Sequence, residues 1–236
     1  LMLLLAMTVT ACDGDSPNMD NDDTGNNGEN NEDDNDEGNK PSPGSNSRYL
    51  VLFASRSGNT ERMAQTIQST LNCDIVEIVP TTPYEEDYNA LLQRAQLEQA
   101  AIGQGNYPAI NTAVNNLEEY DIIFIGYPIW YGHMATPMQT FLHNHADKLK
   151  GKRIALFASS GSSGISTSIT EARTLCSDAT FTETLLLTSS SLSQMQARIT
   201  EWLEQIGAES SGNNNLKNNS RMITIKVGDK TITATM

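Results

Sequence analysis

Short apolar runs recur along the middle of the chain and are separated by longer segments of mixed polarity. The first run, residues 49–54, and the later runs 121–126 and 153–158 contain almost no polar side chain. Such runs are typical of strands that are buried on both faces of a parallel sheet. The sequence therefore predicts five strands, at residues 49–54, 73–79, 121–126, 153–158 and 182–187.

Between these runs, apolar residues recur at helical spacing. After the first run, Met63, Ala64, Ile67 and Leu71 form one stripe, as expected for a helix that covers a sheet. Comparable stripes predict helices within residues 81–101, 136–149, 165–176 and 191–206, and a short helical turn is expected within 111–117.

Strands that alternate with helices predict an α/β fold with a doubly wound parallel sheet, formed by residues 48–207 as one domain. For the strand order 2-1-3-4-5, the first, third and fourth strands are neighbours. Ligands bind beyond the carboxyl ends of such strands. The three unusual loops of the sequence, Ser55–Thr60, Tyr127–Gly132 and Ser159–Gly164, follow these three strands. We therefore expect them to converge on one site.

The first of these loops is small and polar, and it leads directly from a strand into a helix. The first N–H groups of a helix have no partner within it, and the helix dipole favours an anion beside them. The loop is therefore predicted to hold a phosphate group. The alternative is an ordinary helix start that Ser57 or Asn59 caps.

The three loops together resemble those of the flavodoxins. Residues 55–60 match the (T/S)-x-(T/S)-G-x-T phosphate loop of that family, and residues 126–132, GYPIWYG, resemble a second flavin loop that reads GYPIWWG in one branch. Residues 159–164 stand where that branch has a glycine-rich third loop. The resemblance covers residues 48–207 and implies a flavodoxin-like fold with FMN as cofactor. Tyr131 in place of the second Trp departs from the pattern, as does a third loop without acidic and aromatic residues.

The resemblance also implies which residues contact FMN. The phosphate loop offers hydroxyl and N–H donors, and Trp130 and Tyr131 offer stacking surfaces for the flavin ring; the alternative for this pair is that it caps the apolar core. Arg56 is either a solvated side chain or a phosphate clamp. The implied set comprises Ser55, Arg56, Ser57, Gly58, Asn59, Thr60, Pro128, Ile129, Trp130, Tyr131, Gly132, Ser159, Ser160, Gly161 and Gly164.

No side chain of the sequence stands out as a general base or nucleophile, so the flavin is expected to provide the chemistry. His133 follows the second loop and is either a hydrogen-bonding group for flavin or substrate, or a simple loop histidine. No metal site is expected, because His143 and His145 point in different directions on a helix. Cys73 and Cys176 either pair or act as small buried residues.

Charge is distributed unevenly. The net charge is −14, and residues 13–47 contain eight Asp and three Glu against Lys40 alone. No basic stripe is present that could neutralise phosphates, which argues against nucleic-acid binding. Residues 13–47 are expected to be a disordered acidic linker.

The first twelve residues are apolar and end in Val9-Thr10-Ala11-Cys12. They resemble the lipobox of bacterial lipoproteins, which implies lipidation of Cys12 and an extracytoplasmic protein anchored to a membrane. A plain signal peptide is the alternative. At the other end, a linker at 208–220 precedes residues 221–236, whose alternation and Gly-Asp pair predict a β-hairpin. The hairpin resembles the start of a cyclophilin-like domain that would continue beyond it; an edge addition to the sheet is the alternative.

Together these features predict an exported, lipid-anchored FMN oxidoreductase that passes electrons to a small or quinone-like acceptor. A pure electron carrier that docks to membrane redox partners is one alternative. A binding module that has lost its cofactor is another, because a fold does not fix a function.

Overall fold

The computed structural model describes residues 48–209, 222–227 and 230–235. Its main sheet has a parallel core whose strands follow the order β2-β1-β3-β5, and β6 and β7 both pair with β5 in parallel. The strands of this sheet are β1 (Tyr49–Phe53), β2 (Asp74–Glu77), β3 (Ile122–Trp130), β4 (His133–Met134), β5 (Arg153–Ser160), β6 (Thr180–Phe181) and β7 (Leu185–Thr188).

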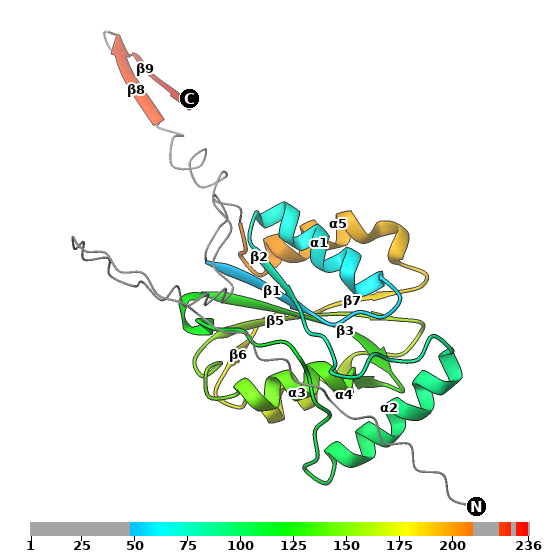
Figure 1. Cartoon of the computed structure of the whole chain (residues 1–236). Coiled ribbons are helices and arrows are strands. Elements are labelled where there is room, and N and C mark those ends of the chain that lie inside the picture. Colours follow the sequence, from blue (N-terminus) through cyan, green and yellow to red (C-terminus); the bar gives the residue numbers. More distant parts are fainter. Residues whose placement is uncertain (1–47, 210–221, 228–229, 236) are drawn as a thin grey trace, which may run out of the picture. The chain divides into compact units, whose positions relative to one another are not determined.

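Helices cover both faces of the sheet (Figure 1). One face packs against α1 and α5 through a buried cluster that includes Ile67 and Trp202, and the other packs against α3 and α4 through a cluster that includes Phe141 and Ala172. The helices are α1 (Asn59–Leu71), α2 (Tyr88–Ile102), α3 (Thr136–His145), α4 (Ser166–Leu175) and α5 (Met195–Gln205), with short 3-10 turns η1 (Leu117–Glu119) and η2 (Leu192–Gln194).

The predicted doubly wound fold is confirmed. The two-residue strand β4 pairs antiparallel with the end of β3, so the parallel strands β2, β1, β3, β5 and β7 are the predicted order 2-1-3-4-5. The fifth strand is in two pieces, β6 beside the start of β5 and β7 beside its end, rather than one run at 182–187.

Two local predictions were wrong. Residues 111–116 are not helical; the 3-10 turn begins only at Leu117, after Asn116 adopts a left-handed conformation with φ of 58°. The predicted loop that begins at Tyr127 is strand as far as Trp130, so β3 is longer than the predicted run 121–126. Its register with β5, in which Pro128 lies opposite Ser159, extends the parallel ladder beyond Gly126.

The predicted C-terminal hairpin is present as the antiparallel strands β8 (Met222–Val227) and β9 (Lys230–Thr235). The predicted lipobox with Cys12, the acidic linker 13–47 and nearly all of the linker 208–220 lie outside the described residues. Among the helices that the structure describes, none has the length and apolar character needed to span a bilayer.

Cys73 and Cys176 are free thiols in different clusters, one on each face of the sheet. Burial raises the pKa of the Cys176 thiol to about 12, and burial together with the charge of Asp74 raises the pKa of Cys73 to the same value. Because the thiolate is the reactive form, we expect neither cysteine to be alkylated by iodoacetamide at pH 8 in the native protein. Site-resolved mass spectrometry should find both modified once guanidinium has unfolded it, and a Cys73–Cys176 disulfide would contradict this prediction.

Candidate cofactor site

Three loops meet at the carboxyl edge of the parallel sheet. In the register, Phe53 at the end of β1 lies opposite Gly126 of β3, and Gly126 lies opposite Phe157 of β5. The first and third loops also touch directly, because the hydroxyls of Thr60 and Ser159 lie 2.7 Å apart and both residues are buried. The predicted convergence of the three loops is therefore present, and the buried contact of Thr60 with Ser159 joins the first loop to the third.

The first loop presents unpaired donors. Gly58 adopts a left-handed conformation with φ of 78° and precedes α1 as its N-cap residue, without a side-chain cap. Neither Ser57 nor Asn59 caps the helix; Ser55 Oγ accepts the N–H of Glu61 at 3.3 Å instead. Within the described part of the chain, no acceptor faces the N–H groups of residues 57–60. These groups form a nest of the kind that binds phosphate.

The second loop is a tight hairpin between β3 and β4. Trp130 pairs with His133, so Tyr131 and Gly132 are the two turn residues, with φ of 51° and 84°. Positive φ at both positions defines a type I′ turn, which explains the glycine. Trp130 is half-buried, whereas 53% of Tyr131 is exposed to solvent. The two predicted stacking residues therefore lie in different environments.

The third loop begins with a buried hydroxyl that lacks a partner. Among the side chains that the structure describes, Ser160 Oγ is buried without any hydrogen bond. Leaving such a group unpaired costs about 1–3 kcal/mol, so it indicates a position that a ligand or water atom completes. Gly161 and Gly164 follow, and a Cβ at either would meet no atom within 4 Å. The loop therefore offers open space next to an unsatisfied donor, which fits a ligand edge.

A cavity of about 240 Å³ opens beside the first two loops. Ser55 and Arg56 line it from the first loop, and Pro128 and Trp130 line it from β3. The ring of Tyr84 meets Trp130 edge to face, with centroids 4.9 Å apart and planes at 72°. Aromatic pairs favour this geometry, so Tyr84 fixes the orientation of Trp130.

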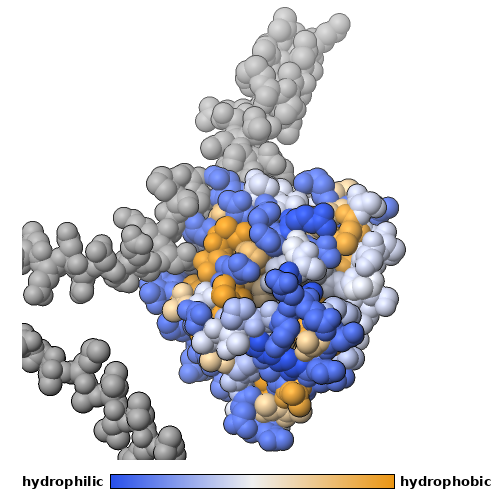
Figure 2. All heavy atoms as spheres, turned by 45° about the vertical axis from the view of Figure 1, so that its right-hand side comes forward, coloured by the Kyte–Doolittle hydropathy of each residue, from blue (hydrophilic) through white to orange (hydrophobic). Residues whose placement is uncertain are grey.

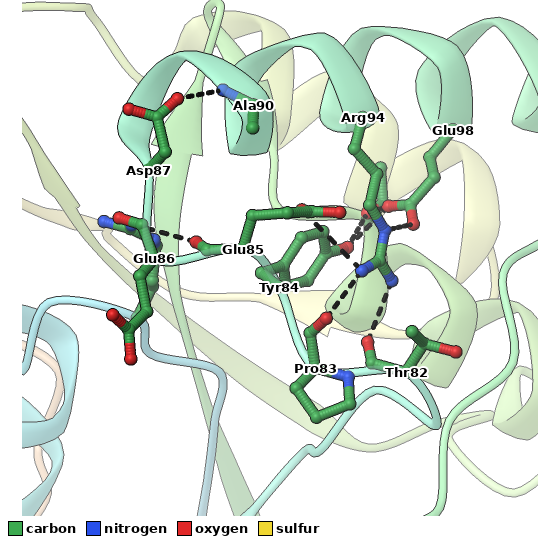
Figure 3. A network of polar contacts seen from close by, with 11 residues as sticks. Thr82, Pro83, Tyr84, Glu85, Glu86, Asp87, Ala90, Arg94 and Glu98 are labelled. Carbon is green, nitrogen blue, oxygen red and sulfur yellow. Dashed lines mark hydrogen bonds and ion pairs between the residues drawn. The ribbon is translucent and has the colours of Figure 1, made fainter.

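Tyr84 is itself held by a polar network between the segment before α2 and the helix (Figure 3). Its hydroxyl donates to Glu98 at 2.5 Å and lies 2.7 Å from the hydroxyl of Thr136. The Arg94 guanidinium lies 4.1 Å from the centre of the Tyr84 ring, and it binds Glu98 and the carbonyls of Thr82 and Pro83 at 2.8–2.9 Å. Burial, followed by the bond to Glu98, raises the pKa of Tyr84, so the hydroxyl stays protonated near neutral pH.

Arg56 is exposed, as the interpretation of a solvated side chain predicts. Its guanidinium also donates to the backbone carbonyls of Glu85 and Glu86, which ties the first loop to the segment before α2. The sequence pattern could not indicate this contact, because its acceptors are main-chain atoms about thirty residues away.

His133 is paired with a side chain that the sequence did not single out. Its Nδ1 lies 2.5 Å from Glu171 Oε1, and Glu171 Oε2 accepts the N–H of Met134 at 2.9 Å. Glu171 of α4 thus binds both residues of β4. Within the described ranges, no three His, Cys, Asp or Glu side chains cluster as metal ligands.

Comparisons with known proteins agree with this geometry. Residues 48–206 match the flavodoxin family. The chain is 32% identical to a candidate flavoprotein from Bacteroides eggerthii, with a TM-score of 0.58 over 70% of this chain and 100% of that one. A flavoprotein from Lactobacillus acidophilus, solved in complex with FMN, is 25% identical, with a TM-score of 0.52 over 63% of this chain and 98% of that one.

A curated relative, an NAD(P)H dehydrogenase (quinone) from Paracoccus denitrificans, is 33% identical over 119 residues. These residues are 48% of this chain and 54% of the relative, so the chain spans about half the length of that relative. The match to the family, by contrast, includes every strand of the main sheet and all three loops. The chain belongs to the flavodoxin family.

Proposed function

We propose that this protein is an FMN-dependent oxidoreductase that passes electrons from a nicotinamide nucleotide to a small, quinone-like acceptor. The observation that carries the proposal is the meeting of the three loops at one edge of the sheet. Three kinds of ligand-binding group lie on these loops: the free N–H groups of residues 57–60, the ring of Trp130 and the unpaired Ser160 hydroxyl. The first and third loops contact each other, and the second and third extend adjacent strands.

The cofactor is FMN, as in the Lactobacillus acidophilus structure. When bound, FMN supplies hydride or single-electron transfer. The N–H groups of residues 57–60 would hold its phosphate. Trp130, oriented by Tyr84, would provide an apolar surface for the ring. The Ser160 hydroxyl and the open backbone at Gly161 would bind a polar edge of it.

The acceptor class is suggested by the Paracoccus relative, which is described as an NAD(P)H dehydrogenase that acts on quinone. The chemistry of the site is compatible with it. The described side chains at the loops include hydroxyls, aromatics and one His–Glu pair, and these bind and orient ligands rather than attack them.

A visible spectrum and a turnover assay test the proposal. The purified protein should be yellow, or become so after addition of FMN and gel filtration, and should oxidise NADH or NADPH with menadione as acceptor. A colourless protein that takes up no FMN would refute the cofactor. A yellow protein without turnover, reducible by dithionite, would favour the electron carrier instead.

The protein is also proposed to be exported and anchored through Cys12. The support is the apolar run that ends at this cysteine and the acidic stretch that follows it. Substitution Cys12→Ser should move the protein from the membrane fraction to the soluble fraction after expression in a bacterium, while FMN binding stays unchanged. Equal membrane association of both forms would contradict lipidation. The cyclophilin-like continuation of the C-terminal hairpin remains a prediction.

A further inference from the structure

A second cavity, of about 350 Å³, lies beside Trp130. Residues of α2 and of the β3–β4 hairpin line it, among them Ala95, Gln99, Ala100, Trp130, His133 and Met134. Trp130 also lines the cavity that reaches Ser55, whereas no residue of the phosphate loop lines this one. The two hollows therefore share one aromatic residue, and only the first contacts the phosphate loop.

The lining of this second cavity has the character of a site for a small, mostly apolar ligand. Alanine, methionine and aromatic side chains form most of its wall, and the polar residues that line it are Gln96, Gln99, His133 and Thr136. A hollow of this size and composition is typical of small-molecule sites. On the face in Figure 2, hydrophobic residues form separate patches between hydrophilic ones.

The helical wall of the cavity is held in place by the polar network before α2. Arg94 and Glu98 alternate along α2 with Ala95 and Gln99, and Arg94 joins the helix to the carbonyls of Thr82 and Pro83. Gln99 in turn accepts from Gln139 of α3 at 2.7 Å. This wall is therefore formed before any ligand arrives.

His133 is the most distinctive polar group of the cavity. An ionised carboxylate only accepts hydrogen bonds, so Nδ1 carries the proton of this contact when Glu171 is ionised. The remaining nitrogen, Nε2, donates to a carbonyl oxygen when the ring is cationic and accepts from a hydroxyl when the ring is neutral. A group with both abilities suits a ligand that alternates between carbonyl and hydroxyl forms, as a quinone and its hydroquinone do.

We infer that this cavity binds the electron acceptor as a carbonyl-bearing aromatic ring, with His133 Nε2 bonded to the carbonyl oxygen and Glu171 as the residue that positions His133. The role of this ligand as electron acceptor rests on the proposed function, but the binding of the ligand in the cavity does not. It assigns the quinone-like ligand a place distinct from that of the cofactor, and Trp130 lines both cavities.

Equilibrium dialysis of the full chain tests the site without any turnover. Menadione is the probe, and 2-methylnaphthalene, which lacks carbonyl groups, is its matched control. The wild-type protein should bind one menadione, with similar affinity before and after saturation with FMN. His133→Phe should weaken menadione binding about tenfold, as expected for loss of one hydrogen bond, and leave 2-methylnaphthalene binding unchanged.

Three further variants separate a binding role from a structural one. His143→Phe, at an exposed histidine of α3 that stacks on Tyr107, should behave as wild type. His133→Gln, which retains a donor, should recover part of the affinity for menadione. Glu171→Gln should weaken menadione binding without affecting 2-methylnaphthalene.

Three outcomes would overturn the inference. Loss of menadione binding on addition of FMN would assign this cavity to the flavin. Unchanged binding by His133→Phe would remove the role of the histidine, and an equal loss for both probes would make that role structural. A protein that takes up no FMN but still binds menadione through His133 would refute the cofactor and leave the acceptor site standing.

Discussion

Replacing Ser57 by Asp should weaken FMN binding by at least about a hundredfold while the fold is preserved. The new carboxylate would lie at the free N–H groups before α1, where the phosphate is expected. Like charges in direct contact cost several kcal/mol, and each 1.4 kcal/mol is tenfold in affinity. The same carboxylate interacts favourably with the helix dipole, so the thermal stability of the FMN-free protein should be equal or slightly higher. Titration of the FMN-free protein with FMN, followed by flavin fluorescence, measures the affinity.

The matched control is Ser69→Asp, which adds the same charge to the exposed surface near the other end of α1. There the affinity for FMN should change by less than about twofold, because the charge is screened beyond about 10 Å. Wild-type affinity in Ser57→Asp would show that the phosphate does not bind at this loop. Equal losses in both variants would point to net charge rather than to the loop.

The fold was predictable from the sequence because parallel strands buried on both faces are nearly free of polar residues. Tyr49–Phe53 illustrates this, since all five of its side chains are buried. The convergence of the loops followed from the strand order alone. Beyond Gly126 the prediction failed because pairing with β5 continues the strand. At residues 111–116 it failed because contacts with a distant segment hold the chain extended: Asn111 donates to the carbonyl of Val79, and the Thr112 hydroxyl accepts the N–H of Val79.

The side-chain geometry of the site was less predictable. Glu171 reaches His133 across 38 positions of the chain, and Tyr84 reaches Thr136 across 52. Only the spacing of Arg94 and Glu98, one helical turn apart, gave a local signal for part of the network. Polar contacts between distant segments depend on how the helices pack on the sheet, and that packing has no local pattern in a single sequence.

The packing beneath the second loop provides a prediction on stability. A Cβ at Gly126 would lie 2.1–2.8 Å from three atoms of the Phe157 ring. That ring is fully buried and contacts Trp202, with centroids 6.3 Å apart, so any shift of it disturbs the core packing. Gly126→Ala should therefore destabilise the protein by about 3 kcal/mol, the upper part of the usual range for overpacked cores. Urea denaturation of the FMN-free protein, monitored by tryptophan fluorescence, measures the loss.

Gly103→Ala is the matched control, because a Cβ at this position at the end of α2 makes only an ordinary contact at 3.4 Å from the Ala100 carbonyl. Its helical φ of −59° suits alanine, so stability should be unchanged or slightly higher. Adding Phe157→Leu to Gly126→Ala should make the pair less destabilising than the sum of the two single changes, because the smaller side chain vacates the space that the new methyl needs. Additive losses would mean that the clash with Phe157 is not the cause. In that case the loss would come from other contacts of the new methyl group.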